Sequence, residues 1–202
     1  ITYKDLPKIK FATAGHPWSL DPSHRDIEDR YILTDKARFY GDAIAAVIAV
    51  DEVIADRALK LIKVEYEVLP NIIKAEDAIK EGAPAIHDER PNNILSEMGS
   101  ESGNVEEDFK NAYKIFEDTF ETSIVQHCQM ENHSAYAYVD GEGRIVVVSS
   151  TQIPHIVRRV VGQAFGIPWG KIRVIKPYVG GGFGNKQDVV LEPLTVEMSL
   201  AV

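Results

Sequence analysis

The residues of this chain best suited to chemistry gather near its C-terminal end, in a loop of sequence GGGFGNKQ at residues 180–187. Glycines in that number let the backbone adopt positive φ and let it approach a ligand closely. Clustered backbone N–H groups beside a helix can hold an anion or an oxo group. The loop therefore predicts a cofactor cradle, although a strained turn between a strand and a helix would use the same residues.

The loop matches neither of the common nucleotide-binding motifs. A P-loop requires a second Gly where this chain has Asn185, and a Ser or Thr where it has Gln187. The dinucleotide pattern G-x-G-x-x-G also fails at Asn185. Lys186 is expected either to contact a phosphate or to be exposed. A non-catalytic module that binds a phosphate or a nucleotide is one alternative, and a loop that acts only as a turn is another.

A second candidate residue is Gln152, which follows Thr151 at the predicted end of a strand. Ligands of open α/β sheets bind outside the carboxyl ends of the strands, and the glycine loop is expected after the next strand. The amide of Gln152 can donate and accept hydrogen bonds toward a ligand that Phe183 and Gly184 surround. The plainer interpretation is that Gln152 caps the helix that begins at Pro154.

The stretch QHCQMENH at residues 126–133 raises the question of a metal site. On a strand, four of its polar side chains would share one face, but their spacing fits no zinc motif. We expect these four residues to brace a site as buried polar groups: His127, Gln129, Glu131 and His133.

Composition narrows the class of protein. The 202 residues are 45% hydrophobic and 26% charged, which is typical of a globular domain. A formal net charge of −9 argues against nucleic acid, because phosphates require Lys and Arg. Cys128 is the only cysteine, so no internal disulfide can form and a reducing, cytoplasmic compartment is expected. The longest apolar run, at 43–50, is too short to span a bilayer, and no membrane partner is expected.

Two groups of elements are expected to position the candidate residues, and loop-forming residues over 81–104 predict the boundary between them. In the first group, residues 1–30 should hold little regular structure, with His16-Pro17-Trp18 in local packing. The pattern that follows predicts a buried strand at 43–50, a helix at 52–61 and a half-buried strand at 63–69.

The second group surrounds the candidate site. The order strand, helix, strand from 144 to 175 predicts a right-handed crossover between parallel strands. The predicted strands are 115–124, 135–139, 144–149 and 172–175, and the second and third of them form a hairpin. Three helices are predicted. The first is short and capped by Asn104, the second covers 154–165 and ends at Gly166, and the third, over 191–202, is unfinished.

Several motifs, in order along the chain, resemble the large subunit of the molybdenum hydroxylases, the xanthine dehydrogenase and aldehyde oxidase family. The loop GGGFG with Thr151-Gln152 upstream carries part of the likeness. The sequences YGDAIAAV at 40–47 and KVEYEVLP at 63–70 resemble the start and the end of the family's small hammerhead module. Gly103-Asn104 before an acidic helix, and His127 to Glu131, also match. Residues 149–188 are especially similar to bacterial xanthine dehydrogenases.

The resemblance implies an α+β fold in two parts. Residues 1–80 would form an incomplete α/β hammerhead module, and residues 81–202 the first part of a molybdopterin-binding domain with a mixed sheet. The chain starts at Ile1 in mid-strand style and stops within a helix, so we expect it to be a piece of a longer polypeptide.

The family's chemistry is also implied by the resemblance. A molybdenum–molybdopterin cofactor would hydroxylate a purine or a related N-heterocycle with oxygen from water, and aldehyde oxidation is the close alternative. Iron–sulfur clusters and FAD on partner domains or subunits would carry the electrons. The catalytic glutamate would lie downstream of Val202, so we expect no catalytic residue here and no activity from this chain alone.

Individual positions follow from the matched motif. Gln152 would hydrogen-bond an oxygen ligand of molybdenum, and the backbone of Gly182, Phe183 and Gly184 would contact the metal and the pterin. Gln152 and Phe183 would lie near molybdenum without ligating it, and Phe183 would help to wall the pocket. Gln187 stands at the substrate position where mammalian-type xanthine enzymes carry Glu. A glutamine can hydrogen-bond a purine but cannot serve as an ionised partner.

Overall fold

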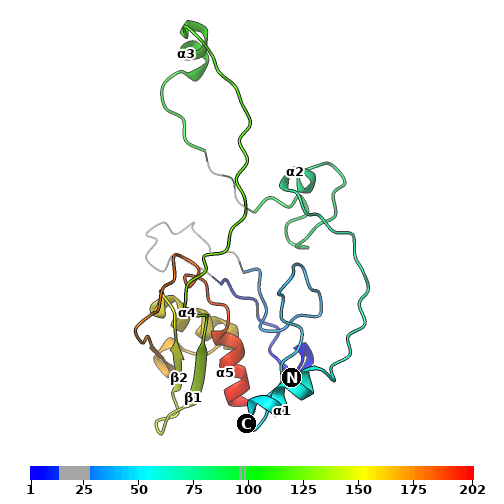
Figure 1. Ribbon diagram of the computed structural model, residues 1–202, viewed down its shortest axis with the longest axis vertical. Coiled ribbons are helices and arrows are strands. Elements are labelled where there is room, and N and C mark those ends of the chain that lie inside the picture. Colours follow the sequence, from blue (N-terminus) through cyan, green and yellow to red (C-terminus); the bar gives the residue numbers. More distant parts are fainter. Residues whose placement is uncertain (14–27, 96, 98) are drawn as a thin grey trace. The chain divides into compact units, whose positions relative to one another are not determined.

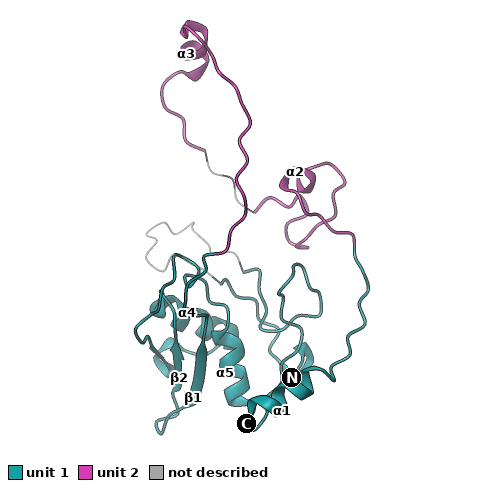
Figure 2. Ribbon diagram, viewed as in Figure 1, with its two compact units in different colours: residues 1–69, 127–202 teal, residues 70–126 magenta. Residues whose placement is uncertain are grey.

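A computed structural model describes residues 1–13, 28–95, 97 and 99–202. These residues form two compact units, 1–69 with 127–202 and 70–126 (Figure 2). The boundaries of these two units do not coincide with the domain boundary predicted at residue 80. That domain boundary stays a prediction. His16-Pro17-Trp18 lies outside the described residues. In the described part of the chain, no helix has the length and apolar character needed to cross a membrane.

A three-stranded mixed sheet forms the centre of the first unit (Figure 1). The central strand β2 (Ile145–Ser149) pairs antiparallel with β1 (Ala135–Val139) and parallel with β3 (Ile172–Ile175). Four of the five residues of β2 are buried, as expected for a strand with neighbours on both sides, and three of the four are β-branched. The predicted hairpin and the predicted parallel pair are confirmed.

The crossover between β2 and β3 is helix α4 (Pro154–Phe165). Proline at its first turn and Gly166 at its end, with φ 65°, are the start and stop signals that the sequence predicts. Its buried stripe faces the core that the sheet and α5 share: Ile156, Val157, Val160, Val161 and Ala164.

Helix α5 (Glu192–Leu200) confirms the predicted C-terminal helix and lies beside the sheet (Figure 1). Its first residue is a buried carboxylate with both oxygens bonded. The Ser149 hydroxyl donates to Oε1 of Glu192 at 2.7 Å, and the Leu191 N–H donates to Oε2 at 3.2 Å. This pair ties the start of α5 to the end of β2.

The N-terminal part of the first unit contains η1 (Tyr3–Asp5) and α1 (Glu52–Leu59). The Asp51 carboxylate accepts from the Ile54 N–H at 2.8 Å and caps α1, which confirms the predicted helix. Three buried side chains of this part join the core of the sheet: Phe11, Ile32 and Leu33.

Three predicted strands are wrong. Residues 43–50 make a single isolated bridge, between Ala45 and Thr2, and Ala46 alone among them is buried. Residues 63–69 and 115–124 are extended and exposed, with Val68 at 86% and Phe120 at 87%. A strand needs a hydrogen-bonded neighbour along its length. The described residues provide no such neighbour for these segments.

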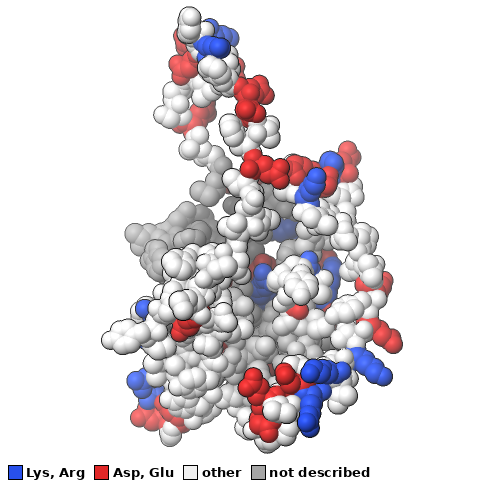
Figure 3. All heavy atoms as spheres, viewed as in Figure 1, with Lys and Arg blue, Asp and Glu red and all other residues white. Residues whose placement is uncertain are grey.

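The second unit has two short helices, α2 (Ala75–Ala78) and α3 (Val105–Asn111). The Asn104 carboxamide accepts from the Glu107 N–H at 3.2 Å, so the predicted cap of α3 is confirmed. Asn93 ties the turns after α2 together, because its side chain donates to the Ala78 and Pro84 carbonyls at 3.0 and 3.1 Å. Both units carry acidic and basic side chains on the face drawn in Figure 3.

Candidate cofactor site

The candidate site lies at the carboxyl end of β2. Because β2 and β3 are parallel, their carboxyl ends meet at the same edge of the sheet. The chain that leaves β3 returns to this edge, where the Gln152 N–H donates to the Lys186 carbonyl at 2.9 Å. The predicted meeting of Gln152 with the glycine loop is therefore present in the structure.

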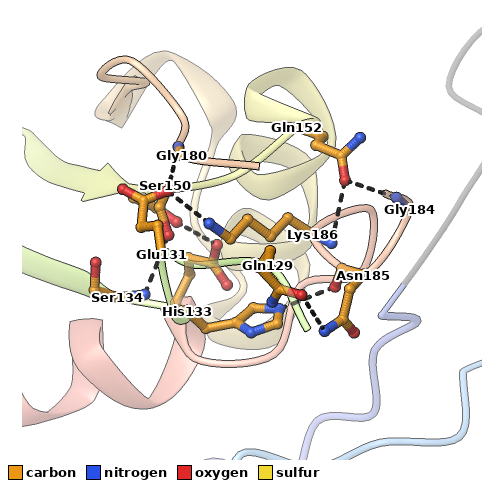
Figure 4. A network of polar contacts seen from close by, with 12 residues as sticks. Gln129, Glu131, His133, Ser134, Ser150, Gln152, Gly180, Gly184, Asn185 and Lys186 are labelled. Carbon is orange, nitrogen blue, oxygen red and sulfur yellow. Dashed lines mark hydrogen bonds and ion pairs between the residues drawn. The ribbon is translucent and has the colours of Figure 1, made fainter. Parts of the chain in front are cut away.

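The side chain of Gln152 is fixed by the loop rather than by α4. Its Oε1 accepts from the Gly184 and Lys186 N–H groups, both at 3.2 Å (Figure 4). Only an oxygen can accept from two N–H groups, so the amide orientation is determined and Nε2 points away from the loop. No described residue accepts a hydrogen bond from this Nε2. The interpretation of Gln152 as a helix cap is wrong, since the N-cap of α4 is Ile153.

The glycine loop adopts positive φ at three positions beside Gln152, and one of them, Phe183, is not a glycine. Gly181, Phe183 and Gly184 have φ of 92°, 51° and 90°. Phe183 is 73% exposed at a φ that a residue with a side chain rarely adopts, which is typical of a functional loop. A Cβ at Gly182 would collide with Oε1 of Gln152, so only glycine fits. The N–H groups of Gly181, Gly182 and Phe183 donate to no residue in the described part of the chain.

An ion pair between a buried lysine and a half-buried glutamate lies beneath the loop. Lys186 is 1% exposed, and its Nζ lies 2.6 Å from Oε2 of Glu131. The Gly180 N–H donates to the same oxygen at 2.8 Å. The hydrogen bond from Lys186, followed by that from Gly180, lowers the pKa of the Glu131 carboxyl. Both expectations for Lys186 are wrong, because its ammonium is neither exposed nor available to a phosphate.

Residues 127–133 are irregular chain rather than a strand, with φ 53° at Cys128, and several of them contact the glycine loop. The Gln129 Oε1 accepts from the Asn185 side chain at 3.4 Å, and Nε2 of His133 lies 2.9 Å from the Asn185 carbonyl. With Glu131, three of the four residues predicted to brace a site contact the loop, although they are half-buried. Within the described ranges, no cluster of three or more His, Cys, Asp or Glu side chains could hold a metal ion.

An open groove of about 650 Å³ runs along the loop, a volume within the usual range of ligand sites. Gln187, the predicted substrate residue, is exposed and does not line this groove. The sequence patterns did not identify Gly180 and Asn185 as partners of residues 127–133. The contacts of these two residues form only because the glycine loop folds back against that segment. The groove is lined by Cys128, Gln129, Met130, Glu131, Gly180, Gly181 and Phe183.

Models of known families match most of the chain. The aldehyde oxidase and xanthine dehydrogenase a/b hammerhead domain matches residues 1–70, and the molybdopterin cofactor-binding domain matches residues 86–202. Among curated proteins, the putative xanthine dehydrogenase molybdenum-binding subunit XdhA of Escherichia coli (strain K12) is 49% identical over 96% of this chain and 25% of that protein. The nicotinate dehydrogenase large molybdopterin subunit of Eubacterium barkeri is 39% identical over 80% of this chain and 37% of that protein.

Solved structures share the fold. The aldehyde oxidoreductase from Desulfovibrio gigas has a TM-score of 0.85 at 27% identity, over 100% of this chain and 22% of that chain. Quinoline 2-oxidoreductase from Pseudomonas putida 86 has a TM-score of 0.80 at 27% identity, over 100% of this chain and 25% of that chain. The chain thus spans about a quarter of such relatives, and the predicted α+β fold is confirmed. The chain belongs to the molybdopterin cofactor-binding family that includes the xanthine dehydrogenases and aldehyde oxidases.

Proposed function

We propose that this chain is the opening part of the molybdenum-binding subunit of a hydroxylase. We place the hammerhead module in residues 1–80 and the start of the molybdopterin-binding domain in residues 81–202. The two family models that support this placement match residues 1–70 and 86–202. The observation that carries the proposal is the Gln152 side chain, which the loop holds by its oxygen, so that its Nε2 is left free among the described residues. The same loop carries three N–H groups, of Gly181, Gly182 and Phe183, that donate to no described residue. When bound, the molybdenum cofactor supplies oxidative hydroxylation with oxygen taken from water.

The residues present fit such a cofactor, because oxygen and phosphate groups of a molybdopterin accept hydrogen bonds and this site offers donors. Gln152 would donate from Nε2, and the backbone of Gly182, Phe183 and Gly184 would line the cofactor. The exposed Phe183 forms part of the wall of the groove. Gln152 and Phe183 would lie near the metal without ligating it.

The proposed substrate is a purine or a related N-heterocycle. The relatives named above include a xanthine dehydrogenase subunit, a nicotinate dehydrogenase and a quinoline oxidoreductase. Gln187 is exposed, and no described residue occupies its amide, so it is able to hydrogen-bond a ring nitrogen or carbonyl. Iron–sulfur and flavin domains or subunits take up the electrons, and the parent enzyme works in the cytoplasm.

Aldehyde oxidation is the second candidate, since the Desulfovibrio gigas aldehyde oxidoreductase shares the fold over the whole chain. A phosphate- or nucleotide-binding module is disfavoured, because Lys186 is buried and paired with Glu131. A loop that serves only as a turn does not explain why Gln152 is held with its donor free.

The test compares Gln152→Ala with Gln163→Ala in the full-length parent enzyme. We expect Gln152→Ala to lower kcat/KM roughly ten- to hundredfold, the cost of one hydrogen bond to a charged group. Gln163, on α4, contacts Glu28 rather than the loop and serves as the control. Molybdenum content is measured by mass spectrometry, and turnover with xanthine, a pyridine heterocycle and an aldehyde. Normal metal content and normal turnover in Gln152→Ala would refute the proposal, and the ranking of kcat/KM identifies the substrate class.

A further inference from the structure

We propose that Glu131 and Lys186 are positioning residues that hold the glycine loop in the shape its ligand requires. Neither residue is expected to touch the substrate, and the effect of each passes through the loop backbone and Gln152. The inference rests on the proposed function, because it assigns these two residues a part in presenting the loop to the cofactor.

One carboxylate oxygen closes the loop at both of its ends. Oε2 of Glu131 accepts from the Gly180 N–H at 2.8 Å and lies 2.6 Å from the Lys186 Nζ (Figure 4). The strained positions, including Phe183 at φ 51°, lie between these two points. A positive φ at a residue with a side chain persists only where the surroundings enforce it. The shared oxygen provides that enforcement.

We call the contacts of Glu131 with Gly180 and with Lys186 the clamp. The first end of the clamp, at Gly180, is also held by a backbone hydrogen bond. The Glu131 N–H donates to the Gly180 carbonyl at 3.3 Å, so Glu131 bonds both backbone groups of Gly180. A Cβ at Gly180 would lie 2.7 Å from Cβ of Glu131, closer than two such carbon atoms can approach. This position therefore requires glycine for the close approach, and the segment around Glu131 is fixed against the loop.

The second end of the clamp leads to Gln152. The Lys186 N–H donates to Oε1 of Gln152, and the Lys186 carbonyl accepts from the Gln152 N–H. The buried side chain of Lys186 thus joins Glu131 to the backbone that orients the Gln152 amide. If the ion pair breaks, the acceptor of Lys186 is lost, and the residue that holds Gln152 is free to move.

Electrostatics makes the two side chains interdependent. The Lys186 side chain is 0% exposed, and Glu131 is the ion-pair partner found for it in the described residues. Neutralising Glu131, whose side chain is 33% exposed, leaves the buried Lys186 charge uncompensated, whereas neutralising both side chains avoids that penalty. The predicted pattern is therefore a severe effect of Glu131→Gln that Lys186→Met in the same protein partly reverses.

The experiment uses the full-length enzyme purified with its cofactor. The variants are Glu131→Gln, Lys186→Met and the double variant. The matched controls are Glu142→Gln, in the exposed hairpin turn, and Lys176→Met, which is also exposed. The first measurement is hydrogen–deuterium exchange of the peptide that spans 180–187, and the second is the Mo(V) electron paramagnetic resonance spectrum.

We expect Glu131→Gln to speed exchange in this peptide by about tenfold or more, the effect of losing local protection. The Mo(V) spectrum should change, while peptides from β2 and α4 exchange as before. The double variant should recover part of the lost protection, because no buried charge is left alone. Both controls should match the parent in exchange and in spectrum.

Each outcome has one interpretation. Unchanged loop exchange and an unchanged spectrum in Glu131→Gln would overturn the clamp. If that variant yields no folded enzyme, Lys186→Met decides by the same two measurements. A normal Gln152→Ala enzyme would instead refute the proposed function, while loop exchange, which needs no cofactor, would still test the clamp.

Discussion

At the scale of single residues, the proposed site combines neutral hydrogen-bond donors with the ion pair between Glu131 and Lys186. Gln152 presents an amide whose oxygen is used up by two backbone N–H groups, so a donor faces outward at every pH. The Glu131 carboxylate and the Lys186 ammonium compensate each other below the loop. This separation leaves a ligand facing hydrogen-bond donors rather than a formal charge.

The pH dependence of the clamp follows from the lowered pKa of Glu131, whose ordinary value is 4.5. A carboxyl with a lowered folded-state pKa stabilises the fold above its unfolded pKa, and this contribution is lost as pH falls through the folded value. We expect the Tm difference between the parent enzyme and Glu131→Gln to be constant above about pH 5 and to shrink below pH 4.5. Thermal scans from pH 7 to pH 3 measure it. A difference that stays constant to pH 3 would contradict the assigned role of the carboxylate.

The sequence predicted some site residues because their types are informative by themselves. A run of glycines and a polar residue at a strand end need no tertiary information to stand out, and the structure brings Gln152, Gly182 and Gly184 together. The pairing of Lys186 with Glu131 could not be predicted in this way, since 55 residues separate the two. Whether a lysine is exposed or paired depends on its burial in the fold, and the local sequence pattern around Lys186 does not determine that burial.

At the scale of elements, local signals succeeded where the contacts are local. The predicted cap Asn104 and the predicted helix end at Gly166 are both present in the structure. The hairpin and the crossover were also predicted, since their strands are close in sequence. The alternating pattern at 63–69 and the apolar run at 43–50 predicted strands that the structure does not contain. A strand depends on a partner strand, and the sequence pattern does not identify that partner.

Helix α4 offers a test of packing. A Cβ at Gly162 would lie 2.6 Å from Cδ1 of Trp169 and 2.9 Å from the Ile167 carbonyl. We expect Gly162→Ala to destabilise the protein by about 1–2 kcal/mol, since overpacking exceeds the gain in helix propensity of roughly 1 kcal/mol. Denaturant unfolding measures the effect. Gly170→Ala is the control, because nothing lies within 4 Å of its Cβ, and equal stability of the two variants would contradict the prediction.

At the scale of the whole molecule, the chain covers about a quarter of its xanthine dehydrogenase relatives. The groove of about 650 Å³ is open, and its walls come from two short segments, 128–131 and 180–183. Small-molecule sites usually bury most of their ligand. The part of the site held by these residues therefore contributes donors and one wall rather than a closed pocket.

The chain expressed by itself should consequently hold the cofactor weakly. In the proposed site, Gln152 and the loop N–H groups would bond one side of the cofactor, and the groove along the loop is open. We expect molybdenum content well below one atom per chain after gel filtration and no hydroxylation of xanthine or of an aldehyde. The full-length parent, prepared in the same host, is the control for cofactor supply. A purified 202-residue chain with one molybdenum atom and hydroxylase activity would show that the site is already complete within these residues.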